Sequence, residues 1–493
     1  MQRGISMYFE HPLKILKYSA KNIWLLVFPL MRGIYTYHFD KNWFYSWVKG
    51  AWFDIAVLGV ILIFGFMRWF SSRIDFTREE IVHRDGIFIR VNTYIPYKNI
   101  SSVTIERPFY LAPFKAMRFR CDTRAGIFKT VDLKLMVGKK THDAIMIHMP
   151  DVDERKKIQG LPQADMLSVL LFSIFFSSGF SGTIYVATFS FKGGDIAHKI
   201  ISRSLNILTA ETAKITEKLV LKIPTAAIFI GVFFIASWFL SFLVNLFRYG
   251  RFTIDCDKHY MKVGYGILDR KEYRIKNSHI NYTDLRQNII MKLFGAVAVN
   301  ISCAGYGASK NRLPVLFPVK SEKSLGKNLN VIGIYSGISN DYRAQPAGIG
   351  SYLLIPLIAA SLIIPSHDWA AKLFPRFAEL SLFVAVMLEI PAVWFIIVKF
   401  VALMTSGVAL YEDKIMIRCS SWTRFHTVVS DKNKVVKIEL EQNLLQAMSG
   451  RCAMSIWFEG EEHKRFKIKA MKAEEVRKIA KIIGYDLGDK VSA

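Results

Sequence analysis

Two hydrophobic patterns alternate along this chain. Long apolar runs occur at six places, and the segments between them alternate apolar and polar residues with the period of two that is typical of β-strands. A bilayer core of about 30 Å needs about 20 helical residues. The pattern therefore predicts about six transmembrane helices in three pairs, over residues 11–37, 51–70, 166–189, 219–247, 349–364 and 379–403.

The first of these runs is the least clean, because Arg32 interrupts its far end. A helix long enough to span the bilayer must include Lys21 or Arg32, whose side chains would reach out to the interface. We predict that this segment spans the membrane.

Each predicted pair of spans is followed by a β-rich segment, so three such domains face the same side of the membrane. We name them domains 1, 2 and 3. The last is predicted to end in an amphipathic helix over residues 473–483, with Val476, Ile479 and Ile483 on one face. The predicted order is residues 1–70, N-terminal segment and pair 1; 71–162, domain 1; 163–248, pair 2 with an amphipathic outer loop at 191–218; 249–348, domain 2; 349–403, pair 3; and 404–493, domain 3.

The β-rich segments are copies of one unit. A step of 180 residues carries Asp75, Gly86, Arg90 and Ile95 onto Asp255, Gly266, Arg270 and Ile275. A looser third copy follows, in which Arg424 is matched to Arg270 and, after one inserted residue, Gln442, Asn443 and Gly450 are matched to Gln287, Asn288 and Gly295. A unit repeated at wide spacing indicates a fold built from repeated domains.

Composition agrees with a membrane protein. Hydrophobic residues make up 52% of the chain although its net charge is +26, a combination that soluble proteins seldom show. The five cysteines have no C-x-x-C spacing, which favours free, packed thiols in a reducing compartment. Lys and Arg near the span ends are more frequent on the domain side, which predicts cytoplasmic domains.

No motif indicates catalysis. The chain has neither G-x-S-x-G nor H-E-x-x-H, and Gly264-x-Gly266 lacks the third glycine of a dinucleotide loop. The histidines are scattered rather than spaced as metal ligands. We therefore predict a protein that is not an enzyme and has no metal or cofactor.

A basic strand in domain 2 is the candidate binding surface. Strand alternation places Arg270, Arg274 and Lys276 on one face and Lys271 on the other. Such a face could bind a partner or anionic lipid headgroups; the alternative is an ordinary solvated strand face. Nucleic acid is not expected, because the aromatic residues are concentrated in the spans and provide no stacking platform.

Glu389 lies near the middle of the sixth predicted span, beside Ile390 and Pro391. A carboxylate at that depth must face protein or water. Two interpretations stay open: an ion or proton pathway, or a hydrogen-bonded contact between helices.

The order of these features resembles a known family. Domain 2 carries Gly264-Tyr-Gly-Ile-Leu-Asp-Arg270, then Ile275, then Leu285-Arg-Gln-Asn-Ile-Ile-Met-Lys-Leu-Phe-Gly295, which resembles the type 2 bacterial pleckstrin-homology (PH-like) domain. The His11-Pro12-Leu13 start and the three rounds of paired spans plus domain resemble the YdbT-like membrane proteins. The copies differ: domain 1 has Arg107, Pro108 and Lys115 at the positions of Gln287, Asn288 and Gly295, and domain 3 has Ser420-Ser421 at the turn glycine.

The resemblance implies a membrane α + β protein whose PH-like domains are seven-stranded bent β-sandwiches, each capped by a C-terminal helix. It also implies a bacterial plasma-membrane location, a smaller YdbS-like partner, and a scaffold role in envelope stress or tolerance of antimicrobial peptides, with no enzymatic activity. The alternative function is a transporter or channel that the PH-like domains regulate.

Overall fold

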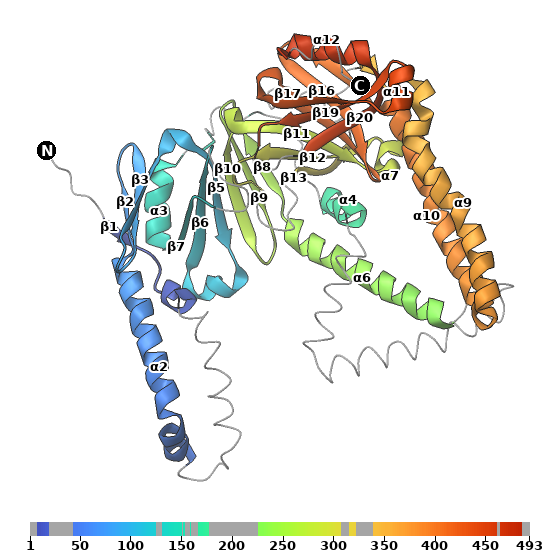
Figure 1. Cartoon of the computed structure of the whole chain (residues 1–493). Coiled ribbons are helices and arrows are strands. Elements are labelled where there is room, and N and C mark those ends of the chain that lie inside the picture. Colours follow the sequence, from blue (N-terminus) through green and yellow to red (C-terminus); the bar gives the residue numbers. More distant parts are fainter. Residues whose placement is uncertain are drawn as a thin grey trace.

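The computed structural model contains three β-sandwiches arranged in an arc, with helices that extend from one side of it (Figure 1). Each sandwich is made of two antiparallel sheets, here called its first and second sheet in chain order. The structure describes residues 7–18, 43–124, 131–149, 151–152, 158, 166–176, 225–306, 315–321, 339–460 and 464–485.

Domain 1 shows the unit most completely. Its buried core includes Ile81, Ile105 and Phe119, and the last two alternate with polar residues along their strands. The first sheet has the order β1 (Met7–Phe9), β2 (Arg73–Phe76), β3 (Glu80–Asp85), β4 (Val91–Pro96). The second contains β5 (Ile100–Arg107), β6 (Ala116–Thr123) and β7 (Leu133–Gly138), linked by η1 (Tyr97–Asn99) and η2 (Phe109–Phe114) and capped by α3 (Lys139–His148).

Domain 2 repeats this order of elements. Its first sheet contains β8 (Thr253–Cys256), β9 (Tyr260–Tyr265) and β10 (Arg270–Lys276). Its second contains β11 (Ile280–Gln287), β12 (Ala296–Cys303) and β13 (Val315–Ser321), with η4 (Asn277–His279) and the short helix α7 (Ile289–Leu293).

Domain 3 is again a seven-stranded unit with a capping helix. The predicted amphipathic helix is confirmed, because Val476 and Ile479 are buried against the sheets. The first sheet contains β14 (Tyr342–Arg343), β15 (Gly407–Tyr411), β16 (Lys414–Ser421) and β17 (Arg424–Asp431); the second contains β18 (Val435–Glu441), β19 (Arg451–Phe458) and β20 (Arg465–Lys472), with η8 (Lys432–Lys434), α11 (Leu444–Met448) and α12 (Ala473–Ile483).

The structure moves two domain boundaries. β1 pairs with β2 and β14 pairs with β15, so each is the outer strand of a first sheet. Both strands precede a helical segment, whereas the prediction placed residues 1–70 outside domain 1 and residue 342 inside domain 2. In domain 2 the amide of Ile158 bonds to the Cys256 carbonyl at the corresponding edge. The sequence could not show this, because two or three residues have no readable period.

Apolar helices connect the sandwiches. In the described part of the chain, residues 346–373 and 381–405 form two helices long and apolar enough to cross a membrane, and residues 56–71, 166–175 and 233–249 form shorter apolar helices. The predicted count of six is thus supported only in part. The helices are α2 (Trp43–Ser71), α4 (Met166–Phe176), α6 (Thr225–Tyr249), and α9 (Ile349–Leu373) and α10 (Ala378–Thr405), which lie side by side (Figure 1). Residues 19–37 of the first predicted span and the predicted outer loop at 191–218 lie outside the described residues.

Candidate functional site: strand junctions between the domains

Neighbouring domains share continuous β-sheets. β5 of domain 1 pairs antiparallel with β10 of domain 2, and β11 of domain 2 pairs with β17 of domain 3. Junction of three strands with three gives a sheet of six, and junction of three strands with four gives a sheet of seven; both sheets cross a domain boundary. We call these pairings junction 1 and junction 2. In both, the second sheet of one domain binds the first sheet of the next.

The two junctions have the same register. Arg107 lies opposite Arg270 in junction 1, and Gln287 lies opposite Phe425 in junction 2. A step of 180 residues carries Arg107 to Gln287, and a step of 155 carries Arg270 to Phe425. The structural equivalent of Arg270 is therefore Phe425. The match of Arg424 to Arg270 is wrong by one residue, because the domain 3 hairpin is one residue longer: six residues separate Cys419 from its partner His426, whereas five separate Tyr265 from its partner Lys271.

Junction 1 encloses an ionic cluster around Glu106. Its side chain is 5% exposed and accepts a hydrogen bond of 2.6 Å from the ammonium of Lys271, which lies directly opposite on β10. Arg120 donates to the same carboxylate at 3.0 Å. Because Lys271 is also 5% exposed, each domain supplies one buried charge that the other neutralises.

Junction 2 encloses a second buried carboxylate, Asp284. Arg286 Nε donates to it at 2.7 Å, His426 Nδ1 lies 2.9 Å away and Lys464 Nζ lies 3.2 Å away. Burial alone would raise the pKa of Asp284, but the Arg286 guanidinium and the His426 ring outweigh burial and hold that pKa well below its usual range. Two of the three partners come from domain 3, so this charge also joins two domains.

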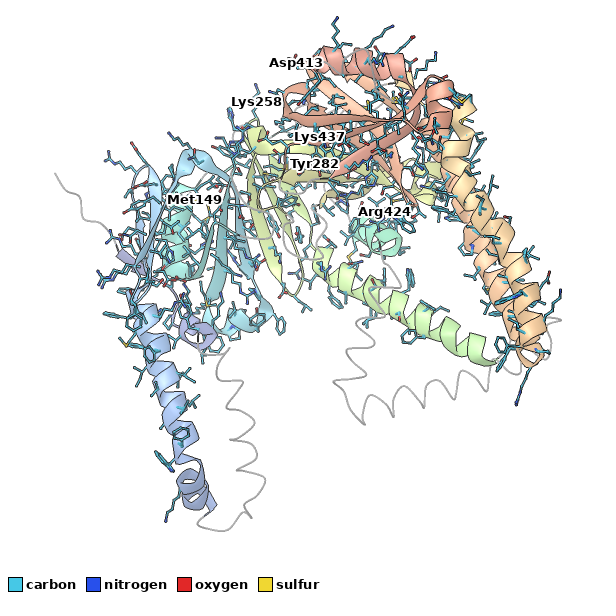
Figure 2. All side chains as sticks on the ribbon, in the orientation of Figure 1. Met149, Lys258, Tyr282, Asp413, Arg424 and Lys437 are labelled. Carbon is cyan, nitrogen blue, oxygen red and sulfur yellow. The ribbon has the colours of Figure 1, made fainter. Side chains whose placement is uncertain are left out.

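Apolar contacts reinforce junction 2. Tyr282 of domain 2 packs on the rings of Phe458 and Phe466 in domain 3, with centroids 5.8 and 5.5 Å apart (Tyr282 is labelled in Figure 2). In return, Met416 and Val429 of domain 3 belong to the core cluster of domain 2. Domains 2 and 3 therefore share core residues as well as a sheet.

The predicted basic surface lies on the junction strand β10. Arg270 is exposed, whereas the Arg274 side chain is only 9% exposed and forms ion pairs with Glu272 at 3.0 Å and Asp151 at 2.9 Å. Lys276 approaches the backbone of domain 1. Arg274 is thus already neutralised, and binding by Arg270, Arg274 and Lys276 stays a prediction. The residue of this strand that forms an ion pair across the junction is Lys271, which alternation had placed on the opposite face from Arg270.

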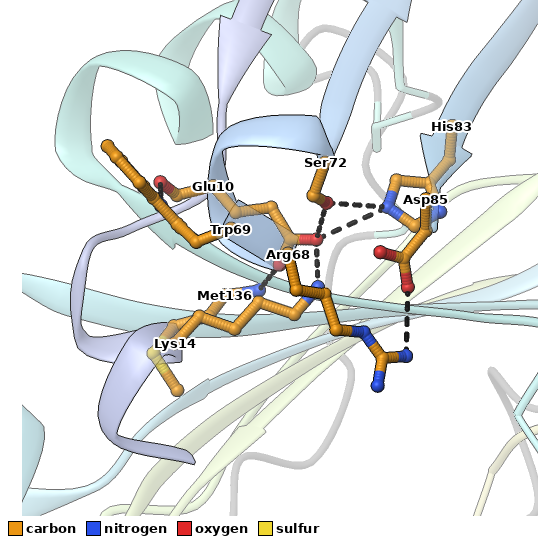
Figure 3. A network of polar contacts seen from close by, with 8 residues as sticks. All are labelled: Glu10, Lys14, Arg68, Trp69, Ser72, His83, Asp85 and Met136. Atoms are coloured by element: carbon orange, nitrogen blue, oxygen red, sulfur yellow. Dashed lines mark hydrogen bonds and ion pairs between the residues drawn. The ribbon is translucent and has the colours of Figure 1, made fainter. Parts of the chain in front are cut away.

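A buried acid that sequence reasoning missed joins the N-terminal segment to domain 1. Glu10 accepts hydrogen bonds from Ser72 Oγ at 2.7 Å and the Met136 amide at 3.0 Å, and it contacts Lys14 and His83 (Figure 3). Its partners come from the end of α2, from β3 and from β7. No spacing in the sequence marks Glu10, because all its partners except Lys14 are distant in the chain.

This network should make stability pH-dependent. Burial would raise the pKa of Glu10, but the His83 hydrogen bond and the Lys14 charge lower it from 4.5 to about 2. The stabilisation is fully present above about pH 5 and is lost as pH falls toward 2. We expect Glu10→Gln to cost about 3 kcal/mol at pH 7. In thermal unfolding scans the gap between wild type and Glu10→Gln should narrow by about 2 kcal/mol at pH 3; a gap that does not change with pH would contradict this prediction.

Each domain places an apolar hairpin tip beside the end of an apolar helix. In domain 1 the tip residues Phe88 and Ile89 are 87% and 80% exposed, and Ser71 at the end of α2 donates to the Gly86 carbonyl. In domain 3, Trp422 is 80% exposed and its carbonyl accepts a hydrogen bond from Lys399 of α10. Large apolar side chains at helix ends suit the headgroup region of a bilayer.

Domain 2 has the same arrangement. The amide of Ile267, in the turn between β9 and β10, bonds to the Phe247 carbonyl at the end of α6, and the next residue, Leu268, is 53% exposed. All three hairpins therefore meet the helix that directly precedes β2, β8 or β15 in the chain.

The α9–α10 pair contains a cavity of about 890 Å³ whose polar lining residues are Glu389 and His367. His367 Nδ1 lies 2.7 Å from Ser381 Oγ, while Glu389 Oε2 is buried and has no hydrogen-bond partner among the described atoms. Among the described residues Glu389 thus lines an apolar cavity, and both of its interpretations, an ion or proton pathway and a hydrogen-bonded contact between helices, stay predictions.

The thiols are structural. All five cysteines are free and buried, and burial raises the pKa of the Cys256 thiol to about 11, which makes it a poor nucleophile at neutral pH. Within the described ranges, no group of three or more His, Cys, Asp or Glu side chains is placed to hold a metal ion.

Comparison with known proteins accounts for the repeat. The bacterial PH domain family matches three separate stretches, residues 43–161, 206–326 and 353–487, which together cover most of the chain. The chain belongs to the bacterial PH domain family. Each match begins in or before the helix that precedes a sandwich and ends near that sandwich's last element, so the family unit includes both.

A relative extends the comparison. A transmembrane protein named YdbT from Bacillus subtilis (strain 168) is 31% identical over 143 residues, which are 28% of this chain and 29% of the relative. The resemblance to YdbT-like proteins with PH-like domains is thereby confirmed, and the chain is a membrane protein. No solved structure matches.

Proposed function

We propose that this bacterial PH-domain protein is a non-enzymatic scaffold of the bacterial plasma membrane, with about six spans and with its PH-like domains in the cytoplasm. The continuity of the sheets across junctions 1 and 2 carries this proposal. Domains that share sheets and buried ion pairs move as one body, which suits a platform better than a set of independent binding modules.

The membrane-facing features support the same role. Exposed tips such as Phe88 and Trp422 would rest in the headgroup layer beside the spans, and the exposed Arg270 would add affinity for anionic lipid. By resemblance to YdbT-like proteins, the complex would include a smaller YdbS-like membrane protein with a PH-like domain and would act in envelope stress or tolerance of antimicrobial peptides.

Purification from native membranes in mild detergent tests the scaffold. We expect a small membrane protein with a PH-like domain to co-purify at a fixed ratio to the chain, together with anionic lipid, as measured by mass spectrometry. A chain that is recovered without any protein partner would argue against the scaffold.

A transporter or channel is the second candidate, because Glu389 lines the cavity between α9 and α10. This function predicts that an ion raises the thermal unfolding temperature of the purified chain and that Glu389→Gln abolishes the effect. A scaffold predicts that the unfolding temperatures of wild type and Glu389→Gln respond equally to each monovalent salt, because general salt effects do not depend on Glu389.

A further inference from the structure

The array of sheets has two open ends among the described strands. β4 in domain 1 is the equivalent of β10 and β17, and it ends its sheet. β18 in domain 3 is the equivalent of β5 and β11, and its one neighbour in the described sheets is β19. The chain thus contains the half-sites of two junctions that its described strands do not complete.

Exposure along β18 shows that its outer edge is uncovered. Val436 is 59% exposed, whereas Ser101 at the same position of β5 is 1% exposed. The side chain of Glu439 is 36% exposed, whereas that of Asp284 at the equivalent position of β11 is 1% exposed. Lys437, labelled in Figure 2, belongs to the same strand. The positions that a junction buries are open here.

The charges on β18 indicate what should cover it. Glu441 is the equivalent of Glu106, the buried acid of junction 1. Its side chain is 43% exposed, and its described ionic partners, Arg465 and Lys467, both belong to domain 3. In junction 1 the acid has in addition Lys271 from the incoming strand.

The incoming strand carries a basic residue at one register position in both junctions. Lys271 fills it in junction 1 and His426 fills it in junction 2, each within reach of the buried acid. The free edge β4 of this chain has Val91 at that position. A second copy of the chain would therefore place an aliphatic side chain opposite Glu441 and leave the acid without its cross-strand cation.

We propose that the outer edge of β18 is a docking site for the first-sheet edge strand of a bacterial PH-type domain in a different membrane protein, with Lys, Arg or His opposite Glu441. This proposal rests on the proposed scaffold function and names the surface through which the scaffold would bind its partner. Main-chain pairing supplies affinity, as in other cases of strand addition, and the opposite charge fixes the register.

Photo-crosslinking of the full-length chain in host membranes tests the site. With p-benzoylphenylalanine at Val436, we expect an adduct whose peptide comes from a PH-type edge strand of another membrane protein and carries the basic residue. The same photoreactive residue at Ile482, 51% exposed on α12, should not give that adduct.

Charge reversal supplies the matched comparison. Glu441→Lys should lower the adduct yield at least tenfold, whereas Glu474→Lys, the same change at an exposed position of α12, should leave it unchanged. An adduct to residues 91–96 would show that the occupant is a second copy of the chain, which would overturn the proposal. Adducts to lipid alone, or no adduct at all, would also overturn it. If the PH-domain partner still co-purifies in those cases, the scaffold function stands and only the assignment to β18 falls.

Discussion

Replacing Asp284 with Ala is expected to lower the free energy of unfolding by about 3 to 5 kcal/mol, because it leaves the Arg286 and Lys464 cations and the His426 ring around a buried site without their carboxylate partner. Arg286, His426 and Lys464 all lie within 3.2 Å of the carboxylate. Urea denaturation of the purified chain should show the loss, and limited proteolysis should show new cleavage between domains 2 and 3.

Two further variants separate charge from volume. Asp284→Asn keeps the size of the side chain and removes its charge, so it should lose most of the same free energy. Asp413→Ala removes a carboxylate from an exposed turn and should change the free energy by less than about 0.5 kcal/mol. A similarly small change for Asp284→Ala would show that the cluster does not hold the junction.

The pH dependence of junction 2 follows from the same carboxylate. Because the pKa of Asp284 is lowered in the folded chain, its stabilising contribution is complete above about pH 4 and is lost only as the pH falls below that value. Domains 2 and 3 should therefore remain joined under mildly acidic conditions.

Gly305→Ala should weaken the contact between domains 1 and 2 at junction 1. Gly305 belongs to domain 2 and has φ +75°, and a Cβ there would overlap the buried side chains of Asp122 and Ser102 in domain 1. Ser102 also donates to the Ala304 carbonyl at 2.5 Å, so the contact cannot relax without losing a buried hydrogen bond. Backbone strain and overpacking together should lower the free energy of unfolding, measured by urea denaturation, by about 2 to 5 kcal/mol.

Gly295 offers a matched control. It has φ +58° and open space around its missing Cβ, so Gly295→Ala carries only the backbone strain, about 1 kcal/mol. If the two variants lower the free energy of unfolding by the same amount, a side chain at position 305 does not clash with domain 1.

The sequence predicted local structure better than contacts between domains. Alternation located the strands of each domain, and the apolar face of residues 473–483 located α12, because both depend on neighbours in the chain. The pairing of β5 with β10 joins residues more than 160 positions apart and leaves no local period. Alternation separated Lys271 from Arg270 correctly, yet only the structure shows that Lys271 faces Glu106.

The outer strands and the polar clusters could not be predicted from the sequence, for a related reason. β14 has two residues, too few for a pattern. Glu10 and Asp284 are single acids, and a single acid in a sequence looks like any exposed one until its distant partners are known. The membrane spans present the opposite case, since composition alone indicates them whether or not their surroundings are known.

The continuous sheets also set an order of events while the chain is being made. The outer edge of β5 is complete at Arg107, but its partner strand begins at Arg270, after the helices between them. At about 5 to 20 residues per second, this edge waits roughly 10 to 30 s on the ribosome. An unpaired edge is prone to wrong pairing for that time. Charged side chains on an exposed edge oppose such pairing, so we expect Glu106 and Arg120 to protect the waiting strand until domain 2 arrives and Glu106 binds Lys271.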